Sequence, residues 1–378
     1  ITSVLAGLST LLLRPQAGKQ PKIGTLLLPD LPVNEIARIT LTSAEDSVVL
    51  TKGETLWQVE NRYAFAADFG KLSEFVRKLS KLKVGRSFEG NPETLERLQL
   101  IDPAQTDADP AKTGVSIKMA DATGKSIAAY ILGSARTTDG GSGGQYLRQA
   151  GGDTIYLVDE SFRFLKKKPA EWLQQDIIDI KEDEIAKVVC YPAGSDQPRF
   201  QVGRSEMGKP AVLLEVPEDR RADNTKIEQL LGALAPLKIK DLAAERRHPA
   251  AAKGEGLHLT YHLYNGQRIH IFPRKEGDDE TARYELQAFV SYEAPLHAPG
   301  SAPTSATAEE RSASEAADTA KDDAKKPTPE EMQALTENLS AKVSGWTFVI
   351  EKWQWQSLIT DVEGLLEAVE NEENGSDT

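Results

Sequence analysis

The apolar positions of one helical stretch recur later in the chain. Residues 67–84, ADFGKLSEFVRKLSKLKV, and residues 222–239, ADNTKIEQLLGALAPLKI, both begin with Ala-Asp and end with Leu-Lys and a β-branched residue. Between these ends, apolar residues recur three and four positions apart, the spacing of an amphipathic helix, and Asp is a good N-cap. We therefore expect two copies of one structural repeat, 155 positions apart.

Alternating apolar and polar residues predict strands around the first helix. The expected strands are 36–42, 47–51, 56–60, 115–119, 127–132, 145–148 and 154–158. Asn91-Pro92 predicts the start of a second helix, because Asn is a good N-cap and Pro is favoured at the first helical position. Short helical pieces are expected at 161–165 and 170–175, with Phe162, Phe164, Leu165 and Trp172 as apolar anchors. Trp57 is expected to pack in the core rather than to stack on a ligand.

The second half repeats the order of strands and then a helix. Strands are expected at 187–191, 199–203, 211–216 and 346–350, and a hairpin at 258–264 and 267–272 around Asn265-Gly266, a preferred two-residue turn. Thr328-Pro329 with Glu331 predicts a capped helix. A last helix is expected to carry the apolar residues from Trp355 to Val369, followed by a frayed acidic end, 370–378.

These elements predict an α+β fold of two tandem repeats, each an antiparallel sheet with packed helices, behind an N-terminal membrane helix. The expected parts are an anchor and connector at 1–22, a first repeat at 23–180 and a second repeat at 181–378. Residues 295–327 are rich in Ala, Ser, Pro and charge, so we expect a flexible insertion within the second repeat.

The amino-terminal stretch predicts membrane attachment. Residues 1–13, ITSVLAGLSTLLL, have no charge, and Arg14, Lys19 and Lys22 follow them. Thirteen residues fall short of the roughly 20 that a membrane-spanning helix needs, but the chain begins with Ile1, and we expect a few preceding residues to complete the span. A signal-peptide core and a buried helix are the alternatives.

Composition narrows the function classes. The formal net charge is -13 and the pI is about 5.1, which argues against a nucleic-acid partner because phosphate binding needs clustered Lys and Arg. The chain has one cysteine, Cys190, in the apolar run Val188 to Tyr191, where a buried thiol is expected.

Two patterns could indicate a ligand site: a run of glycines could bind phosphate, and three histidines could bind a metal. The surrounding sequence argues against both sites. Gly140, Gly141, Gly143 and Gly144 lead into a strand rather than a helix, so a hairpin loop is expected instead of a phosphate loop. The hairpin carries His258, His262 and His270. If Asn265-Gly266 is a two-residue turn, His262 and His270 point to opposite faces, and His258 lies about 13 Å from His262 at roughly 3.3 Å per residue.

No catalytic, cofactor-binding or metal-binding residues are therefore expected, and no nucleophile motif is present. Changing His258, His262, Cys190 or Ser142 to Ala is expected to leave partner binding intact.

Scattered motifs resemble the bacterial family called domain of unknown function 4340. The similar segments are Gly53 to Val59, the helix at Ala67-Asp68, Leu98 to Pro103, Ile131 to Gly133, Tyr146 to Arg148, Ile155 to Val158, Ala222-Asp223 and Trp346 to Trp355. The resemblance covers most of residues 36–370, with 295–327 as a departure. It implies an accessory protein of an ABC transporter of the gliding-motility type, with one membrane helix and a large extracytoplasmic part.

We therefore expect a non-catalytic accessory or scaffold protein of the inner membrane, single-pass, with its bulk on the periplasmic side. The expected partners are membrane proteins such as ABC transporter subunits. The alternative is an extracytoplasmic protein that binds a glycan or small ligand.

The membrane expectation can be tested by fractionation. The full-length chain should sediment with membranes, and a chain that begins near Ile23 should be soluble and folded, because the apolar density is confined to residues 1–13. Recovery of the intact full-length chain in the soluble fraction would contradict the anchor.

Overall fold

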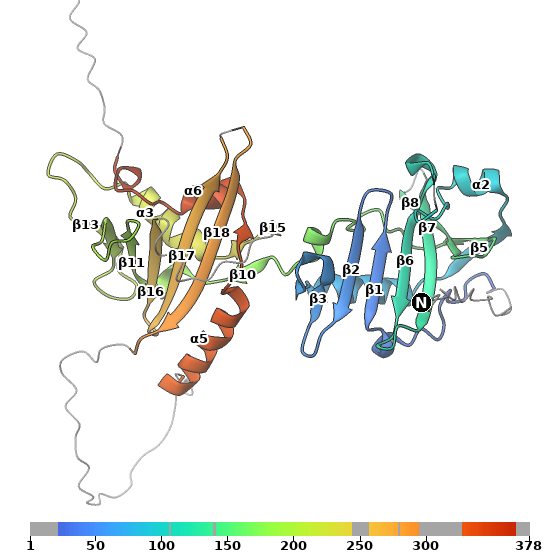
Figure 1. The fold of residues 1–378 in the computed structure, drawn as a ribbon, viewed down its shortest axis with the longest axis horizontal. Coiled ribbons are helices and arrows are strands. Elements are labelled where there is room, and N and C mark those ends of the chain that lie inside the picture. Colours follow the sequence, from blue (N-terminus) through green and yellow to red (C-terminus); the bar gives the residue numbers. More distant parts are fainter. Residues whose placement is uncertain are drawn as a thin grey trace, which may run out of the picture. The chain divides into compact units, whose positions relative to one another are not determined.

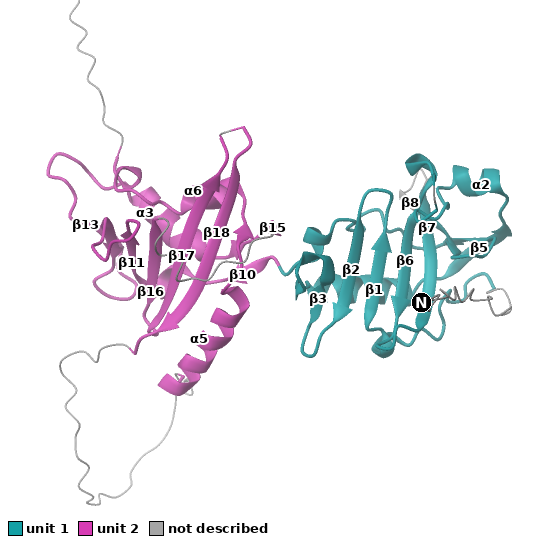
Figure 2. Cartoon of the chain, in the orientation of Figure 1, with its two compact units in different colours: residues 1–174 teal, residues 175–378 magenta. Residues whose placement is uncertain are grey.

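The chain divides into two compact units, residues 1–174 and 175–378 (Figures 1 and 2). The computed structural model describes residues 22–105, 107–138, 141–243, 257–278, 280–294 and 327–367. Each unit is a mixed α+β structure with a large antiparallel sheet and few helices, which confirms the expected class. The expected anchor at 1–13, residues 295–326 of the expected insertion and the acidic end from 368 lie outside the described residues.

Unit 1 contains a nine-stranded sheet in the order β4-β3-β2-β1-β6-β7-β8-β9-β5, in which all neighbours are antiparallel. Its strands are β1 (Arg38–Thr42), β2 (Ser47–Lys52), β3 (Trp57–Val59), β4 (Phe65–Ala66), β5 (Val84–Glu89), β6 (Val115–Ala120), β7 (Ser126–Thr138), β8 (Gly141–Gln149) and β9 (Thr154–Val158). Its helices are α1 (Phe69–Ser80) and α2 (Pro92–Arg97), with 3-10 turns η1 (Val33–Glu35), η2 (Glu60–Arg62), η3 (Pro110–Lys112) and η4 (Pro169–Trp172).

Unit 2 contains an eight-stranded sheet in the order β13-β12-β11-β16-β17-β18-β19-β15 and a two-stranded sheet, β10-β14. Its strands are β10 (Asp176–Ile178), β11 (Ile185–Tyr191), β12 (Phe200–Gly203), β13 (Val212–Leu214), β14 (Leu237–Lys238), β15 (Asp241–Leu242), β16 (His258–Leu263), β17 (Gln267–Glu276), β18 (Arg283–Tyr292) and β19 (Phe348–Val349). Its helices are α3 (Asn224–Leu231), α5 (Pro329–Val343) and α6 (Lys352–Ser357), with 3-10 turns η5 (Glu182–Glu184), η6 (Gly232–Leu234) and η7 (Glu363–Leu365).

Helices α1 and α3 begin at the two aspartates that the repeat predicts. The Asp68 carboxylate accepts a hydrogen bond from the Lys71 amide at 3.0 Å, and the Asp223 carboxylate accepts from the Thr225 amide at 2.9 Å. Both helices bury the residues of the shared stripe: Leu72, Phe75, Val76 and Leu79 in α1, and Ile227, Leu230 and Leu231 in α3. Capping and burial together fix where each helix starts and which side faces its sheet.

The last segment of each unit returns to the start of this helix. In unit 1, the Asp68 amide donates to the Trp172 carbonyl at 2.8 Å, and Ala67 pairs with Leu173. In unit 2, the Asp223 amide donates to the Leu365 carbonyl at 2.9 Å, and Ala222 pairs with Leu366. Each return satisfies the amide of the N-cap residue and holds the helix against its own sheet.

The return explains why the expected last helix is wrong. The structure has the short helix α6, followed by η7, instead of one helix that continues through Leu366. Leu365 and Leu366 are buried, and Leu366 pairs with Ala222 as an isolated bridge. A continuous helix would remove this extended pairing, so the tertiary contact overrides the local apolar spacing.

Three further expectations also need correction. Gly141 to Gly144 belong to β8 and not to a loop. Residues 161–165 form no helix, and Phe164 is 91% exposed rather than an anchor. Strand β18, which lies between β17 and β19, was not expected from the sequence.

Within the described part of the chain, no helix is long and apolar enough to span a bilayer.

The caps provide a test of the two helices. Asp68→Ala and Asp223→Ala should each lower the free energy of unfolding by about 1 kcal/mol, because each removes the carboxylate that accepts from first-turn amides. Urea denaturation of each unit's transition measures the effect. Asp30→Ala, at an exposed turn residue, is the control and should change nothing; an equal loss there would remove the cap explanation.

Candidate functional site

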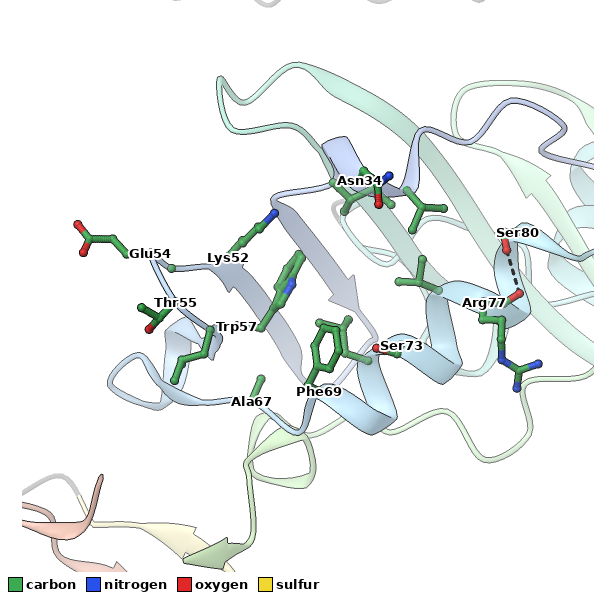
Figure 3. A pocket seen from close by; sticks show the side chains of 16 residues that line it. Asn34, Lys52, Glu54, Thr55, Trp57, Ala67, Phe69, Ser73, Arg77 and Ser80 are labelled. Atoms are coloured by element: carbon green, nitrogen blue, oxygen red, sulfur yellow. Dashed lines mark hydrogen bonds between the residues drawn. The ribbon is translucent and has the colours of Figure 1, made fainter. Parts of the chain in front are cut away.

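A groove of ≈ 840 Å³ lies beside helix α1 in unit 1 (Figure 3). One wall is the side of α1 that carries Phe69, Ser73 and Arg77; the facing wall is the β2–β3 hairpin with Trp57, and η1 closes one end. Its volume is within the range of sites that accept a ligand or a partner's side chains.

The walls of this groove expose large apolar side chains. Phe69 is 63% exposed, Leu56 is 46% exposed and Val33 is 43% exposed, all in one hollow. Single exposed apolar residues are ordinary, but several that line one groove indicate a binding surface.

Trp57 lies at this groove instead of in the core. It is the first residue of β3, opposite Lys52 on β2, and it is half-buried. The next residue on the same face, Val59, is fully buried. Trp57 therefore marks the point where the core of unit 1 opens into the groove, and the core-packing expectation is corrected accordingly.

Two cations border the groove from opposite walls. Lys52 comes from the hairpin and Arg77 from α1, and both are exposed (Figure 3). Among the residues that the structure describes, neither has an ion-pair partner. Glu54 lies at the hairpin tip of the same wall. The groove therefore combines exposed apolar side chains with two cations that form no ion pair and one carboxylate, in an acidic protein.

In unit 2, the histidine hairpin has a register one residue different from the expected one. His262 pairs with Arg268, and Thr260 pairs with His270, because the connection is not a two-residue turn. The Gly266 amide donates to the Leu263 carbonyl at 3.1 Å, and Gly266 has φ +90°, which is the geometry of a three-residue loop with a glycine bulge. A slip of one residue reverses the face of every side chain on one strand.

This register puts the three histidines on one face of the sheet, which corrects the expectation that His262 and His270 point to opposite faces. We call this surface the histidine face; it consists of Tyr191, His258, Thr260, His262, Arg268 and His270. The opposite face carries Tyr261, whose hydroxyl donates to the Leu230 carbonyl of α3 at 3.1 Å. The histidine face is therefore directed away from α3.

Aromatic rings stack along this face. Tyr191 and His258 have ring centroids 4.8 Å apart, and His258 and Phe272 have centroids 5.1 Å apart. Phe289 continues the series, 5.8 Å from Phe272 and 4.2 Å from His270, and all four interplanar angles are 23° or less. Neighbouring rings thus turn their faces to one another and their edges outward.

The histidines differ in their surroundings. His270 has both ring nitrogens engaged, Nδ1 with the Thr260 hydroxyl at 3.1 Å and Nε2 with the Ser291 hydroxyl at 2.9 Å. Burial lowers the pKa of His262 to about 4, and the nearby charges of Lys187 and Arg268 add to this effect. His262 is therefore a neutral imidazole near pH 7.

No three His, Cys, Asp or Glu side chains in the described ranges are grouped so that they could hold one metal ion. Cys190 is fully buried, its thiol donates to the Thr360 carbonyl at 3.3 Å, and burial raises its pKa to about 12. A thiol with this pKa is inert as a nucleophile.

The family model described as "Domain of unknown function (DUF4340)" matches residues 57–258, more than half of the chain. The chain belongs to the DUF4340 family. No curated protein and no solved structure matched the sequence. The DUF4340 match begins at Trp57 of the groove, includes α1 and α3, and ends at the first residue of β16. The match confirms the resemblance found in the sequence. Its description assigns no activity to the family.

Sequence reasoning missed the groove for an identifiable reason. Phe69 lies three positions before Leu72 and seven before Val76, so helical spacing alone assigns it to the buried stripe. The available signal was the similar segment 222–239, where the corresponding residue is Asn224. A position that is polar in one of two similar helices does not have to be buried in the other.

The pKa of His262 predicts how unit 2 responds to pH. Unfolded, His262 takes up a proton below about pH 6.5, whereas folded it does so only near pH 4, so the free energy of unfolding should fall as the pH decreases between these values. Histidine NMR titration and urea denaturation at several pH values measure both effects. His262→Gln should remove this part of the pH dependence; an unchanged profile would contradict the assignment.

Proposed function

We propose that this DUF4340 protein is a non-catalytic accessory or scaffold protein of a membrane complex of the ABC-transporter type. In this proposal, residues 1–13 belong to a single-pass anchor in the inner membrane, and both units lie on the periplasmic side. The groove beside α1 is the surface that docks on the partner.

We also infer that the two units are tandem copies of one α+β repeat. The sheet order β3-β2-β1-β6-β7-β8-β9-β5 in unit 1 corresponds strand by strand to the order in unit 2. In both, the helix follows the outer strands of one side, and the last segment returns to the aspartate that caps it. Residues 67–84 and 222–239 align without a gap.

The comparison between copies is the observation that carries the docking proposal. Four buried positions of α1 correspond to buried positions of the second copy: Leu72 to Ile227, Phe75 to Leu230, Val76 to Leu231 and Leu79 to Leu234. Phe69 corresponds to Asn224, and both are exposed. The repeat thus folds with a polar residue at this position, so the exposed phenylalanine of unit 1 is not needed for folding.

The charges of the groove indicate what it accepts. An apolar segment of a partner protein would cover Phe69 and Leu56, and a carboxylate on that segment would meet Lys52 or Arg77. Complementary charge favours encounter and fixes orientation, and burial of the aromatic residue supplies most of the affinity.

Attachment to the membrane would strengthen this docking. A body tethered to the bilayer by a short connector has a high effective concentration for its neighbours, so a weak interface suffices. No nucleophile, metal group or cofactor motif in the described residues requires a catalytic role in addition.

Co-purification with membrane partners tests the proposal. Phe69→Asn installs the residue of the second copy and should reduce partner recovery at least tenfold with the thermal midpoint unchanged, because the side chain is mostly exposed. Arg77→Glu should act in the same direction.

The matched control is Glu228→Lys on the exposed side of α3, the counterpart of Ser73. Full recovery of the partner with both groove variants would contradict docking at this groove. Loss of cellular activity in Cys190→Ala with intact folding and co-purification would replace the scaffold role with a chemical one.

A further inference from the structure

The histidine face of unit 2 forms a second hollow, which the docking proposal does not use. It has a volume of ≈ 510 Å³ and is lined by the histidine face and by Gly194, Ser195 and Asp196 of the β11–β12 loop. The volume is within the range of small-molecule sites. Because the docking groove lies in unit 1, the two surfaces can be tested separately.

The hollow is partly lined by stacked aromatic rings. Tyr191 and His258 line it and stack on each other, and the buried Phe272, which does not line it, stacks on His258 from β17. The faces of the His258 ring are therefore covered, and its edge turns outward. The edge of an aromatic ring is the positive part of its quadrupole. Such an edge attracts the oxygen atoms of a ligand, whereas an open ring face would attract cations or C–H groups.

The polar groups of the hollow suit an uncharged ligand. Arg268 forms an ion pair with Glu293, so much of its positive charge is compensated. Asp196 of the β11–β12 loop is exposed and lines the hollow, and no ion pair joins it to another described residue. An anion would meet the Asp196 carboxylate, and a metal would find the ring nitrogens of His270 already engaged.

His262 adds a group that can recognise a hydroxyl. Its Nε2 is shielded from solvent and has no hydrogen-bond partner within the described ranges. A neutral imidazole nitrogen pairs readily with a hydroxyl, which can both donate and accept. A buried polar atom without a partner is costly, so a ligand hydroxyl that pairs with Nε2 when the imidazole turns toward the hollow gains a bond without breaking another.

We propose that this hollow binds a neutral sugar unit of a glycan. Its hydroxyls meet the guanidinium of Arg268, the carboxylate of Asp196, the imidazole of His262 and the outward edge of the His258 ring. The site is a binding site without chemistry.

The test is NMR of the imidazole groups in the full-length chain. Three of the five histidines belong to the histidine face, so single His→Gln variants assign their signals. The protein is kept in a detergent without a sugar headgroup. The probes are glucose, galactose, mannose, N-acetylglucosamine, maltose, cellobiose and chitobiose, each to 50 mM, with sodium phosphate, sodium acetate and zinc chloride as comparisons.

At least one sugar should shift the His262 and His258 signals with saturation. His262→Ala and Asp196→Asn should each weaken that sugar at least tenfold; Asp196 is exposed, so the second variant does not depend on folding. Lys209→Ala, at an exposed turn outside the hollow, should leave the affinity unchanged.

The proposal is wrong if no sugar shifts these signals, if only phosphate, acetate or zinc does, or if both site variants bind the sugar as the unchanged chain does. None of these outcomes bears on the groove of unit 1, whose failure would appear in co-purification alone.

Discussion

Each unit closes at a contact between its last segment and the start of its helix. The Asp68 and Asp223 amides donate to the carbonyls of Trp172 and Leu365, which come from the far end of the respective unit. Their carboxylates meanwhile accept from amides inside the first turn. One aspartate thus satisfies amides at the helix terminus through its carboxylate and ties the last segment of the unit to the helix through its own amide.

The features that the sequence predicted correctly, the helix starts and most strands, depend on interactions between residues that are close in the chain. Helix starts were located correctly at Asp68, Asn91, Asp223 and Thr328, because a cap needs only residues within one turn. Alternation located most strands of both sheets for the same reason. It failed at β18. There a charged residue, Glu285, is buried and paired with two arginines, so it interrupts the alternation of apolar and polar positions that predicts a strand. The ion pairs that let the Glu285 carboxylate be buried join residues of two strands, and the periodicity of one strand does not show them.

The candidate surfaces were harder to predict because each depends on a contact beyond the reach of local patterns. Asn265-Gly266 indicated a hairpin correctly, but Gly266 adopts a bulge, and a one-residue slip decides whether His270 joins His262. The exposure of Phe69 follows from how far α1 covers its sheet, which helical spacing does not specify. In both cases the sequence contains the residues but does not show which other residues lie beside them in the folded chain.

If the two units are copies of one repeat, as we propose, their comparison separates residues that serve folding from those that serve binding. Positions that are apolar in both copies, such as Leu79 and Leu234, are buried in both, and each core needs them. On the same proposal, a position such as Phe69, with the exposed Asn224 as its counterpart, is free to vary because unit 2 folds without an apolar residue there. Unit 1 exposes apolar surface beside its helix, whereas unit 2 gathers polar and aromatic groups on the sheet face directed away from its helix. Because these surfaces use different parts of one common frame, a change in either can alter recognition without loosening the contacts on which both units depend.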